Sequence, residues 1–210
     1  QQWLKSLTKR HCLTFSTEHK DADIYADNIE SLVGGCYRFE LCSGGKKLSL
    51  DLPMPGLHSV KNAVAAAACA VASGIGLEQI ARGLSAVKPV SGRLNSYQLD
   101  EDITLIDDTY NANPDSFKAA IDVLSLREGR RVLVMGDMAE LGEEAMQMHE
   151  EIGRYAQEKG IDTLYSVGLL SAVAANQFGG THYQDKNQLI TAIADLLAKK
   201  TKTTILIKGS

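Results

Sequence analysis

A cluster of carboxylates and amides follows an apolar run near the middle of the chain. Residues 107–114 read Asp-Asp-Thr-Tyr-Asn-Ala-Asn-Pro and come directly after Ile-Thr-Leu-Ile at residues 103–106. The short apolar run predicts a buried strand, and the Asn, Asp and Pro residues that follow it predict a loop. Open α/β sheets bind ligands at the carboxyl ends of their strands. This segment is therefore the strongest candidate for a binding site.

Within this segment, Asp108 is a better ligand candidate than Asp107. Side chains alternate along a strand, so the two carboxylates point to opposite faces and only one can reach a given cleft. The carboxylate of Asp108 could accept hydrogen bonds from ribose hydroxyls. Asn111 and Asn113 could bind polar groups of a substrate, or they could form the turn before a helix that begins at Pro114. The turn alone is sufficient to explain Asn113.

Two further polar segments are predicted at the same edge of the sheet, because parallel strands present their carboxyl ends together. Residues 136–142 read Gly-Asp-Met-Ala-Glu-Leu-Gly after a second strand, and residues 208–210 read Lys-Gly-Ser after a last strand. Asp137 and Glu140 could hold a cation or an amine, or they could favour the start of the next helix through its dipole. Lys208, followed by a glycine turn, suits anion binding.

Other candidates each have a simple structural alternative. His58 and Asn62 are four residues apart at the start of a predicted helix, so they share one face. An imidazole can stack on a flat base and an amide can pair with an adenine edge; alternatively, His58 packs near the helix start and Asn62 caps it. Arg93 could contact a phosphate bound between domains, or it could be an exposed surface arginine. His149 is interpreted as a satisfied histidine at the edge of the core rather than as a catalytic base.

The bulk properties exclude several classes of function. The 210 residues are 44% hydrophobic and 23% charged, as in an ordinary soluble globular protein. A net charge of −4 and scattered lysines and arginines argue against nucleic acid and a membrane as partners. None of the four cysteines forms a Cys-x-x-Cys pair, which favours structural thiols in a reducing compartment and indicates neither zinc nor a disulfide framework.

A familiar phosphate-binding motif is missing from the sequence. A P-loop requires a glycine, four residues and then Gly-Lys-Ser/Thr, between a strand and a helix. Gly45-Lys46 is followed instead by Lys47, and residues 43–46 predict a hairpin turn between two strands. No other segment of the 210 residues supplies the pattern.

The order of predicted elements indicates two domains, residues 1–91 and residues 92–210. Antiparallel strands are predicted at residues 12–16, 24–26, 37–42 and 47–52, and helices at about 58–72 and 77–84. After a linker at residues 87–92, strands are predicted at 104–106, 131–135, 163–167, 181–183 and 204–207, and helices at about 114–126, 143–159, 170–178 and 187–198. Such alternation predicts an α/β domain with a mostly parallel sheet and helices on both faces.

Together these segments resemble the Mur ligase superfamily, over essentially the whole chain. Residues 55–63 contain the His-x-x-x-Asn element that is shared across the superfamily. Gly-Arg-Leu at residues 92–94 and Lys-Gly-Ser at residues 208–210 match as well. Residues 107–114 and 136–142 carry strings that are specific to the branch that adds D-alanyl-D-alanine.

The resemblance implies that residues 1–91 are the C-terminal part of an ATP-binding central domain of the P-loop type. It implies that residues 92–210 are a Rossmann-like C-terminal ligase domain. The implied enzyme is a cytoplasmic, ATP-dependent ligase of peptidoglycan synthesis. ATP would phosphorylate the terminal carboxylate of UDP-N-acetylmuramoyl-tripeptide, the amine of D-alanyl-D-alanine would attack the acyl phosphate, and Mg²⁺ would offset the charge. We expect a monomer.

Carried over position by position, the resemblance also implies roles for individual residues. The nucleotide would be held by His58 and Asn62 at the adenine, by Arg93 at a phosphate and by Asp108 at the ribose. The residues facing the substrates would be Asn111, Asn113, Asp137, Glu140, Lys208 and Ser210.

The family's P-loop, its magnesium ligands and its modified lysine all precede Gln1, so no catalytic residue and no metal ligand is expected within the chain. The family's final helix follows Lys-Gly-Ser, and without it we expect part of one sheet face to be uncovered. We therefore expect an excerpt of a longer protein that does not catalyse ligation alone. Two alternatives remain open: another Mur-type or folylpolyglutamate-type amide ligase, and a non-catalytic nucleotide-binding module.

Overall fold

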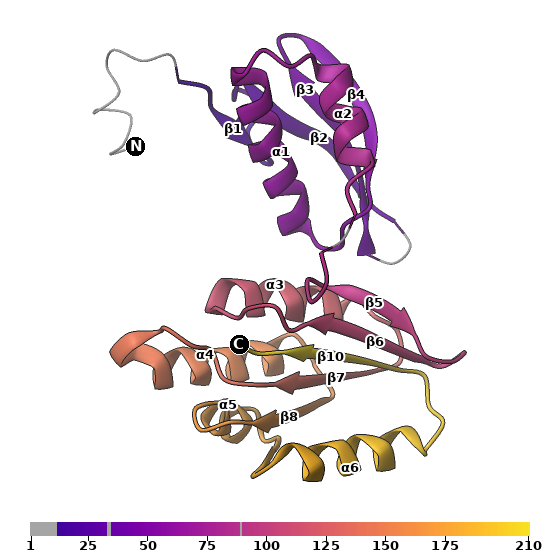
Figure 1. The fold of residues 1–210 in the computed structure, drawn as a ribbon, viewed down its shortest axis with the longest axis vertical. Helices are drawn as coiled ribbons and strands as arrows, with labels where there is room; N and C mark the ends of the chain where they lie inside the picture. The colour runs from indigo at the N-terminus through magenta and orange to yellow at the C-terminus, as the bar shows by residue number, and fades with distance from the viewer. Residues whose placement is uncertain (1–11, 33–34, 89) are drawn as a thin grey trace. The chain divides into compact units, whose positions relative to one another are not determined.

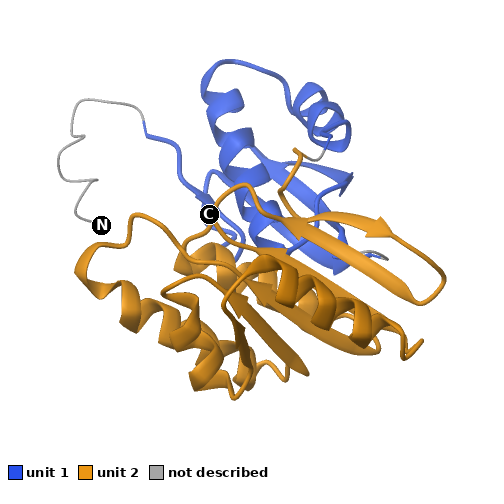
Figure 2. Ribbon diagram, turned by 60° about the horizontal axis from the view of Figure 1, so that its bottom comes forward, with its two compact units in different colours: residues 1–88 blue, residues 89–210 orange. Residues whose placement is uncertain are grey.

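The computed structural model describes residues 12–32, 35–88 and 90–210. The chain divides into two compact units, unit 1 (residues 1–88) and unit 2 (residues 89–210), which Figure 2 colours blue and orange. Each unit has its own sheet and its own apolar core (Figure 1). The domain boundary expected after residue 91 stays a prediction. Residues 1–11 and 33–34 of the first predicted domain, and residue 89 of the predicted linker, lie outside the described residues.

Unit 1 is a four-stranded sheet with two helices. Its strands, in spatial order, are β1 (Phe15–Ser16), β2 (Ile24–Ser31), β3 (Tyr37–Ser43) and β4 (Lys46–Leu52). Its helices are α1 (Leu57–Ala72) and α2 (Leu77–Ser85). The pairing of β2, β3 and β4 is antiparallel, as predicted, whereas the short β1 pairs with β2 in parallel. Gly44 and Gly45, with φ of 56° and 77°, close the predicted β3–β4 hairpin.

The helices of unit 1 bury the apolar face of its sheet. The core consists of Ile24, Ala26, Phe39, Leu41, Leu50, Leu52, Val60, Ala63, Val64, Ala67, Ala68, Leu77 and Ile80. Alternate residues of β3 and β4 contribute to it, which is the pattern of strands with one covered face. The alanines of α1 carry little side-chain bulk, so the helix backbone can lie close to the strands.

Unit 2 is a six-stranded sheet with helices on both faces (Figure 1). Its strands are β5 (Asn95–Gln98), β6 (Ile103–Asp108), β7 (Arg130–Met135), β8 (Thr163–Val167), β9 (Thr181–Tyr183) and β10 (Thr203–Lys208). Its helices are α3 (Pro114–Ser125), α4 (Ala145–Glu158), α5 (Ser171–Phe178) and α6 (Lys186–Leu197), with a 3₁₀ turn, η3 (Gly142–Glu144), before α4. The predicted α/β architecture is confirmed.

The strand order of unit 2 is β5-β6-β10-β7-β8-β9, and every pairing except β5–β6 is parallel. Helices α3, α4 and α5 pack on one another and cover one face, whereas α6 packs on β8 and β9 from the other. Along β7, Leu133 and Met135 belong to the core under α3–α5, and Val132 and Val134 to the core under α6. Because both faces are covered, residues 132–135 of β7 are all apolar and buried.

This order of strands places three carboxyl ends side by side. The chain reaches β10 through α6, on the face opposite α3–α5, and β10 inserts between β6 and β7. The carboxyl ends of β6, β10 and β7 therefore lie next to one another at one edge of the sheet. Ligands of open α/β sheets bind outside the carboxyl ends of the strands. All three candidate segments of unit 2 begin there.

The packing of α4 on α5 depends on a glycine. A Cβ added to Gly153 would collide with the carbonyl oxygen of Ala174. We expect Gly153→Ala to lower the free energy of unfolding by about 1–3 kcal/mol, because the helices must move apart. Urea unfolding followed by circular dichroism measures the change.

Gly83→Ala is the matched control, because Gly83 lies in α2 with no atom within 4 Å of an added Cβ. This variant should gain up to about 1 kcal/mol from helix propensity. An equal gain in stability for both variants would show that α4 and α5 are not in close contact at Gly153.

Candidate functional site

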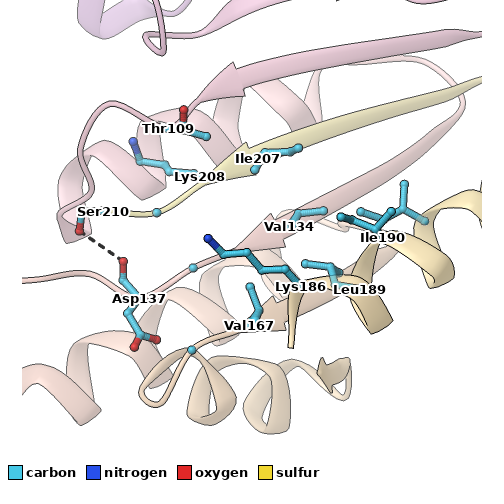
Figure 3. A pocket seen from close by; sticks show the side chains of 14 residues that line it. Thr109, Val134, Asp137, Val167, Lys186, Leu189, Ile190, Ile207, Lys208 and Ser210 are labelled. Carbon is cyan, nitrogen blue, oxygen red and sulfur yellow. Dashed lines mark hydrogen bonds between the residues drawn. The ribbon is translucent and has the colours of Figure 1, made fainter. Parts of the chain in front are cut away.

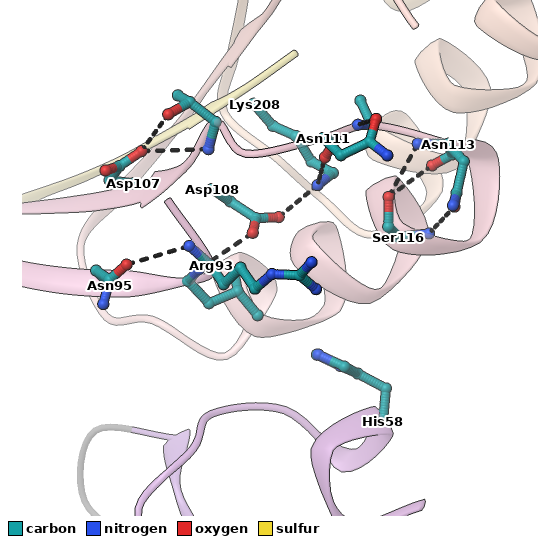
Figure 4. Close-up of polar contacts among 12 residues, drawn as sticks. His58, Arg93, Asn95, Asp107, Asp108, Asn111, Asn113, Ser116 and Lys208 are labelled. Atoms are coloured by element: carbon teal, nitrogen blue, oxygen red, sulfur yellow. Dashed lines mark hydrogen bonds and ion pairs between the residues drawn. The ribbon is translucent and has the colours of Figure 1, made fainter. Parts of the chain in front are cut away.

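A buried ion pair joins the carboxyl ends of β6 and β10 (Figure 4). The Nζ of Lys208 lies 2.6 Å from Oδ2 of Asp108, and the two side chains are 2% and 11% exposed. The parallel register pairs Lys208 with Asp108, so the strands themselves bring the two charges together. The ammonium also lies 5.5 Å from the ring centroid of Phe117. Both charged groups are therefore buried inside unit 2.

The same two side chains hold the neighbouring loops. Nζ of Lys208 donates to the carbonyl oxygen of Asn111 at 2.9 Å. Oδ1 of Asp108 accepts a hydrogen bond from the N–H of Leu94 at 3.1 Å. Leu94 is buried and has a φ of 53°, a conformation that is unfavourable for leucine. Asp108 and Lys208 thus fix both the turn at residues 92–94 and the loop at residues 109–113.

This arrangement bears on two predicted ligand contacts. We expected Asp108 to reach a ribose and Lys208 to face an anion or a substrate. In the structure their charged groups point at each other inside unit 2, and both oxygens of Asp108 have partners. Direct contact with a ligand stays a prediction for both residues. Their hydrogen bonds position the backbone at Leu94 and Asn111.

Arg93 follows the turn that Asp108 holds, and its side chain is exposed. The Cζ of its guanidinium lies 4.3 Å from the ring centroid of Tyr110. Within residues 90–210, no carboxylate lies within 4.0 Å of this guanidinium. A guanidinium whose N–H donors are unpaired can bind a phosphate or carboxylate through two parallel hydrogen bonds. Arg93 is therefore the predicted site residue whose geometry best suits anion binding.

The two asparagines form the turn that leads into α3. Asn113 caps the helix: its side chain accepts from the N–H of Ser116 at 2.8 Å, while the N–H of Asn113 donates to Oγ of Ser116 at 3.0 Å. Oδ1 of Asn111 accepts from the N–H of Ala112 at 2.7 Å. The turn interpretation is confirmed for Asn113, and substrate contacts stay predictions for both asparagines.

Asp137 also accepts hydrogen bonds from the backbone. Its oxygens accept from the N–H groups of Leu169, Leu170 and Ser171 at 2.9, 3.0 and 2.7 Å. These groups form the N-terminus of α5, whereas we expected the helix that follows directly, α4. Burial alone raises the pKa of Asp137, but these hydrogen bonds outweigh it and hold the pKa below its ordinary value of 3.8. Glu140 is exposed, with a φ of 60°.

Ser210 ties the end of β10 to the segment at residues 136–142. Its N–H donates to the carbonyl oxygen of Asp137 at 3.0 Å, and its Oγ accepts from the N–H of Ala139 at 2.9 Å. A Cβ on Gly209 would lie 2.9 Å from the Cα of Gly136, so the two backbones approach closely because both residues are glycines.

His149 is fully buried and holds the same segment from α4. Its Nε2 accepts a hydrogen bond from the N–H of Met138 at 3.0 Å, so Nδ1 carries the proton and donates to the carbonyl oxygen of Ala145 at 2.6 Å. The interpretation of His149 as a satisfied histidine is confirmed.

A cleft of about 510 Å³ lies beside these strand ends, on the α6 side of the sheet (Figure 3). Its walls are mostly apolar: Val134, Val167, Leu189, Ile190, Ile193 and Ile207. Thr109, Asp137, Lys186, Lys208 and Ser210 line it as well. On this face of the sheet, α6 packs on β8 and β9. We expected part of one sheet face to be uncovered, and the cleft lies on the face that carries α6.

His58 and Asn62 belong to unit 1. They lie four residues apart in the first turns of α1, with His58 half-buried and Asn62 exposed. The N-cap of α1 is Gly56 and has no side-chain hydrogen bond, so the alternative that Asn62 caps the helix is wrong. A shared nucleotide between these residues and Arg93 or Asp108 of unit 2 stays a prediction.

Two kinds of feature are absent from the described part of the chain. No group of three or more His, Cys, Asp or Glu side chains there comes together in a way that could hold a metal ion. No helix among the same residues is long and apolar enough to cross a membrane.

The buried pair predicts a large effect of removing one partner. Lys208→Met leaves the carboxylate of Asp108 buried without its cation, so we expect the free energy of unfolding to fall by about 3–5 kcal/mol. Adding Asp108→Asn should recover part of this loss, because the amide can still accept from Leu94. Lys202→Met, which breaks the exposed pair with Glu128, is the control and should change stability far less. Equal effects of Lys202→Met and Lys208→Met in urea unfolding would contradict the pairing.

The hydrogen bonds of Asp137 predict a pH dependence. Because its pKa is lowered in the folded state, the ionised carboxylate stabilises the protein above its ordinary pKa of 3.8, and this contribution disappears as the pH falls through the folded-state pKa. Asp137→Asn should therefore destabilise the protein near neutral pH, and the difference from wild type should narrow below about pH 4. Urea midpoints measured across this range test it, and a constant difference would count against the assignment.

Comparison with known proteins places the chain in a family. The family profile "Mur ligase, glutamate ligase domain" matches residues 92–210, more than half of the chain, and "Mur ligase middle domain" matches residues 1–70. The UDP-N-acetylmuramoyl-tripeptide–D-alanyl-D-alanine ligase of Escherichia coli (strain K12) is 41% identical over 99% of this chain and 46% of its own length. The Haemophilus influenzae ligase of the same name is 36% identical over 98% and 50%. The chain thus spans about half the length of these relatives.

Solved structures agree. A crystal structure of MurF from Acinetobacter baumannii has a TM-score of 0.90 at 33% identity and covers 98% of this chain and 45% of that one. MurF ligase from Thermotoga maritima in complex with ADP has a TM-score of 0.76 at 25% identity, over 97% and 46%. With two family profiles in chain order, and with relatives and folds that agree along nearly all of its length, this chain belongs to the Mur ligase family.

Proposed function

We propose that the chain is part of an ATP-dependent amide ligase that joins D-alanyl-D-alanine to UDP-N-acetylmuramoyl-tripeptide. The observation that carries this proposal is the 41% identity, along 99% of the chain, to the E. coli ligase named for that reaction. The proposed setting is the cytoplasm, where the enzyme would complete the peptide of a peptidoglycan precursor.

The proposed reaction has two steps. The terminal carboxylate of the tripeptide attacks ATP and becomes an acyl phosphate, with release of ADP. The amine of D-alanyl-D-alanine then attacks the acyl carbon, phosphate leaves, and an amide bond remains. The chemistry moves a highly charged phosphoryl group, so positioning and stabilisation of negative charge are what the protein must supply.

In this proposal the chain supplies part of the nucleotide site. Arg93 would contact a phosphate, which is supported by its exposed guanidinium with no carboxylate partner among residues 90–210. His58 and Asn62 would hold the adenine, and Asp108 the ribose. The related MurF ligase from Thermotoga maritima was solved in complex with ADP, which supports an adenine nucleotide as the ligand class.

Mg²⁺ would offset the charge of the phosphates. Its ligands are proposed to lie outside this chain, as the resemblance to the family implies. The substrate-facing roles of Asn111, Asn113, Asp137, Glu140, Lys208 and Ser210 are retained as proposals. In the structure the side chains of Asn113, Asp137 and Lys208 are already engaged within unit 2.

A related amide ligase is the second candidate. Folylpolyglutamate synthase from Thermotoga maritima has a TM-score of 0.60 at 22% identity, which shows a shared fold alone. The relatives with 36% and 41% identity are ligases named for D-alanyl-D-alanine. These relatives favour the D-alanyl-D-alanine ligase.

The proposal predicts how activity divides between the chain and the full-length protein. The 210-residue chain should release no phosphate above background with ATP, tripeptide and D-alanyl-D-alanine, because it contains no P-loop. The full-length protein should release phosphate with D-alanyl-D-alanine and not with glutamate or D-alanine alone. A coupled phosphate assay measures both.

Each outcome of this assay has a distinct meaning. Turnover by the 210-residue chain would refute its predicted inactivity. Use of glutamate by the full-length protein would favour another amide ligase. A full-length protein that binds ATP and releases no phosphate with any amine would point to a non-catalytic module.

A further inference from the structure

Tyr110 is a large aromatic side chain that the fold keeps in solvent. It lies in the loop after β6, and 62% of its surface is exposed. Its ring contacts the guanidinium of Arg93, with 4.3 Å between Cζ and the ring centroid. An arginine over the face of a tyrosine is attracted by the negative charge of the π-system. Because most of the ring is exposed, packing in the core does not explain a tyrosine here, whereas the contact with Arg93 does.

The backbones beneath the two side chains are tied together. The N–H of Tyr110 donates to the carbonyl oxygen of Gly92 at 3.0 Å. A Cβ on Gly92, whose φ is 71°, would lie 3.0 Å from the nitrogen of Tyr110, so a larger residue would push the two segments of this contact apart. The N–H of Arg93 is itself held by the carbonyl oxygen of Val90 and by Oδ1 of Asn95, both at 3.1 Å. The backbone segments that carry Tyr110 and Arg93 are therefore held in place by hydrogen bonds.

Stacking orients a guanidinium without using its donors. The Cζ of Arg93 lies over the face of the Tyr110 ring, and within residues 90–210 no acceptor takes a hydrogen bond from its guanidinium N–H groups. Arg131 of the same unit shows the contrast, because Asp162 accepts from its Nε at 2.9 Å and from its Nη2 at 3.2 Å. A carboxylate of that kind fixes an arginine but neutralises it and occupies its donors. Tyr110 fixes Arg93 and leaves charge and donors available.

We propose that Tyr110 is a positioning residue that presents the guanidinium of Arg93 to a phosphate group of the bound nucleotide. This inference rests on the proposed function, in which Arg93 contacts a phosphate. Without the ring, the long side chain of Arg93 would sample many rotamers, and the phosphate would have to order it on binding. The aromatic face is the essential feature, and the phenol hydroxyl is not.

The stack itself can be tested in the 210-residue chain by NMR. Ring currents should shift the side-chain Hε and Hδ signals of Arg93 upfield. Tyr110→Leu should abolish this shift and Tyr110→Phe should retain it. Tyr97→Leu removes another exposed tyrosine of unit 2 and is the matched control. Arg93 signals at random-coil positions in the wild-type chain would overturn the inference.

The consequence is tested in the full-length enzyme with steady-state kinetics. Tyr110→Leu should raise the KM for ATP about three- to tenfold, the range expected for a partly exposed cation–π contact, with a smaller change in kcat. Tyr110→Phe should restore a KM within about twofold of wild type. In an Arg93→Ala background, Tyr110→Leu should have no further effect, because a positioning residue acts through its partner.

The arms of the experiment separate two kinds of failure. If Arg93→Ala leaves ATP kinetics unchanged, the proposed phosphate contact of Arg93 is wrong. If Arg93→Ala impairs ATP use while Tyr110→Leu does not, Arg93 keeps its role and the inference about Tyr110 is overturned. An equal loss for Tyr110→Leu with and without Arg93 would also overturn it, because the ring would then act independently.

Discussion

The carboxylate of Asp108 and the ammonium of Lys208 are charges that unit 2 removes from water at the carboxyl edge of its sheet. A buried charge is tolerated when a partner and further hydrogen bonds compensate for lost hydration. The two groups pair with each other, and each makes a further hydrogen bond to the backbone. Asp108 accepts from the N–H of Leu94, and Lys208 donates to the carbonyl oxygen of Asn111. Because the buried charges need these hydrogen bonds, they fix the turn at residues 92–94 and the loop at residues 109–113. The residues lie 100 positions apart, and the parallel register alone brings them together.

The other segments of this edge follow the same rule. Asp137 accepts hydrogen bonds from the first backbone N–H groups of α5. Ser210 accepts one from the N–H of Ala139, and His149 accepts one from the N–H of Met138. Polar groups that look available in the sequence are mostly used to hold loops in place. Arg93 is different, because its guanidinium is exposed and contacts a ring rather than a carboxylate. An edge built this way is pre-organised and keeps a cation at its surface, which suits a negatively charged ligand.

The sequence was a good guide to the elements and a weaker guide to their partners. Apolar runs such as residues 132–135 (Val-Leu-Val-Met) predict buried strands because both faces of a parallel sheet exclude water. Residues 95–98 (Asn-Ser-Tyr-Gln) carry no such signal, so β5 was missed; its pairing with β6 comes from the hairpin rather than from burial. The direction of β1 was wrong for a similar reason, since two residues hold too little pattern to fix a pairing.

The site shows the same limit. Chemistry-bearing residues were located at strand ends correctly, because strand direction determines which ends meet. The sequence could not show that Asp108 pairs with Lys208, that Asp137 reaches α5, or that Tyr110 stacks on Arg93. Each contact joins segments far apart in the chain or depends on a rotamer. Opposite charges at the ends of neighbouring strands were the one available signal for the first contact, and they require the strand order to be known.

Amide hydrogen exchange of the 210-residue chain can show whether the Asp108–Lys208 pair holds this edge together. If it does, the amides of Leu94 and Tyr110 should exchange as slowly as those of β6 and β10, although both follow loop sequences. Both amides should lose protection together in Asp108→Ala, while amides of β8 keep theirs. Exchange of Leu94 and Tyr110 at the rate of an exposed loop in the wild-type chain would mean that the pair does not hold these segments.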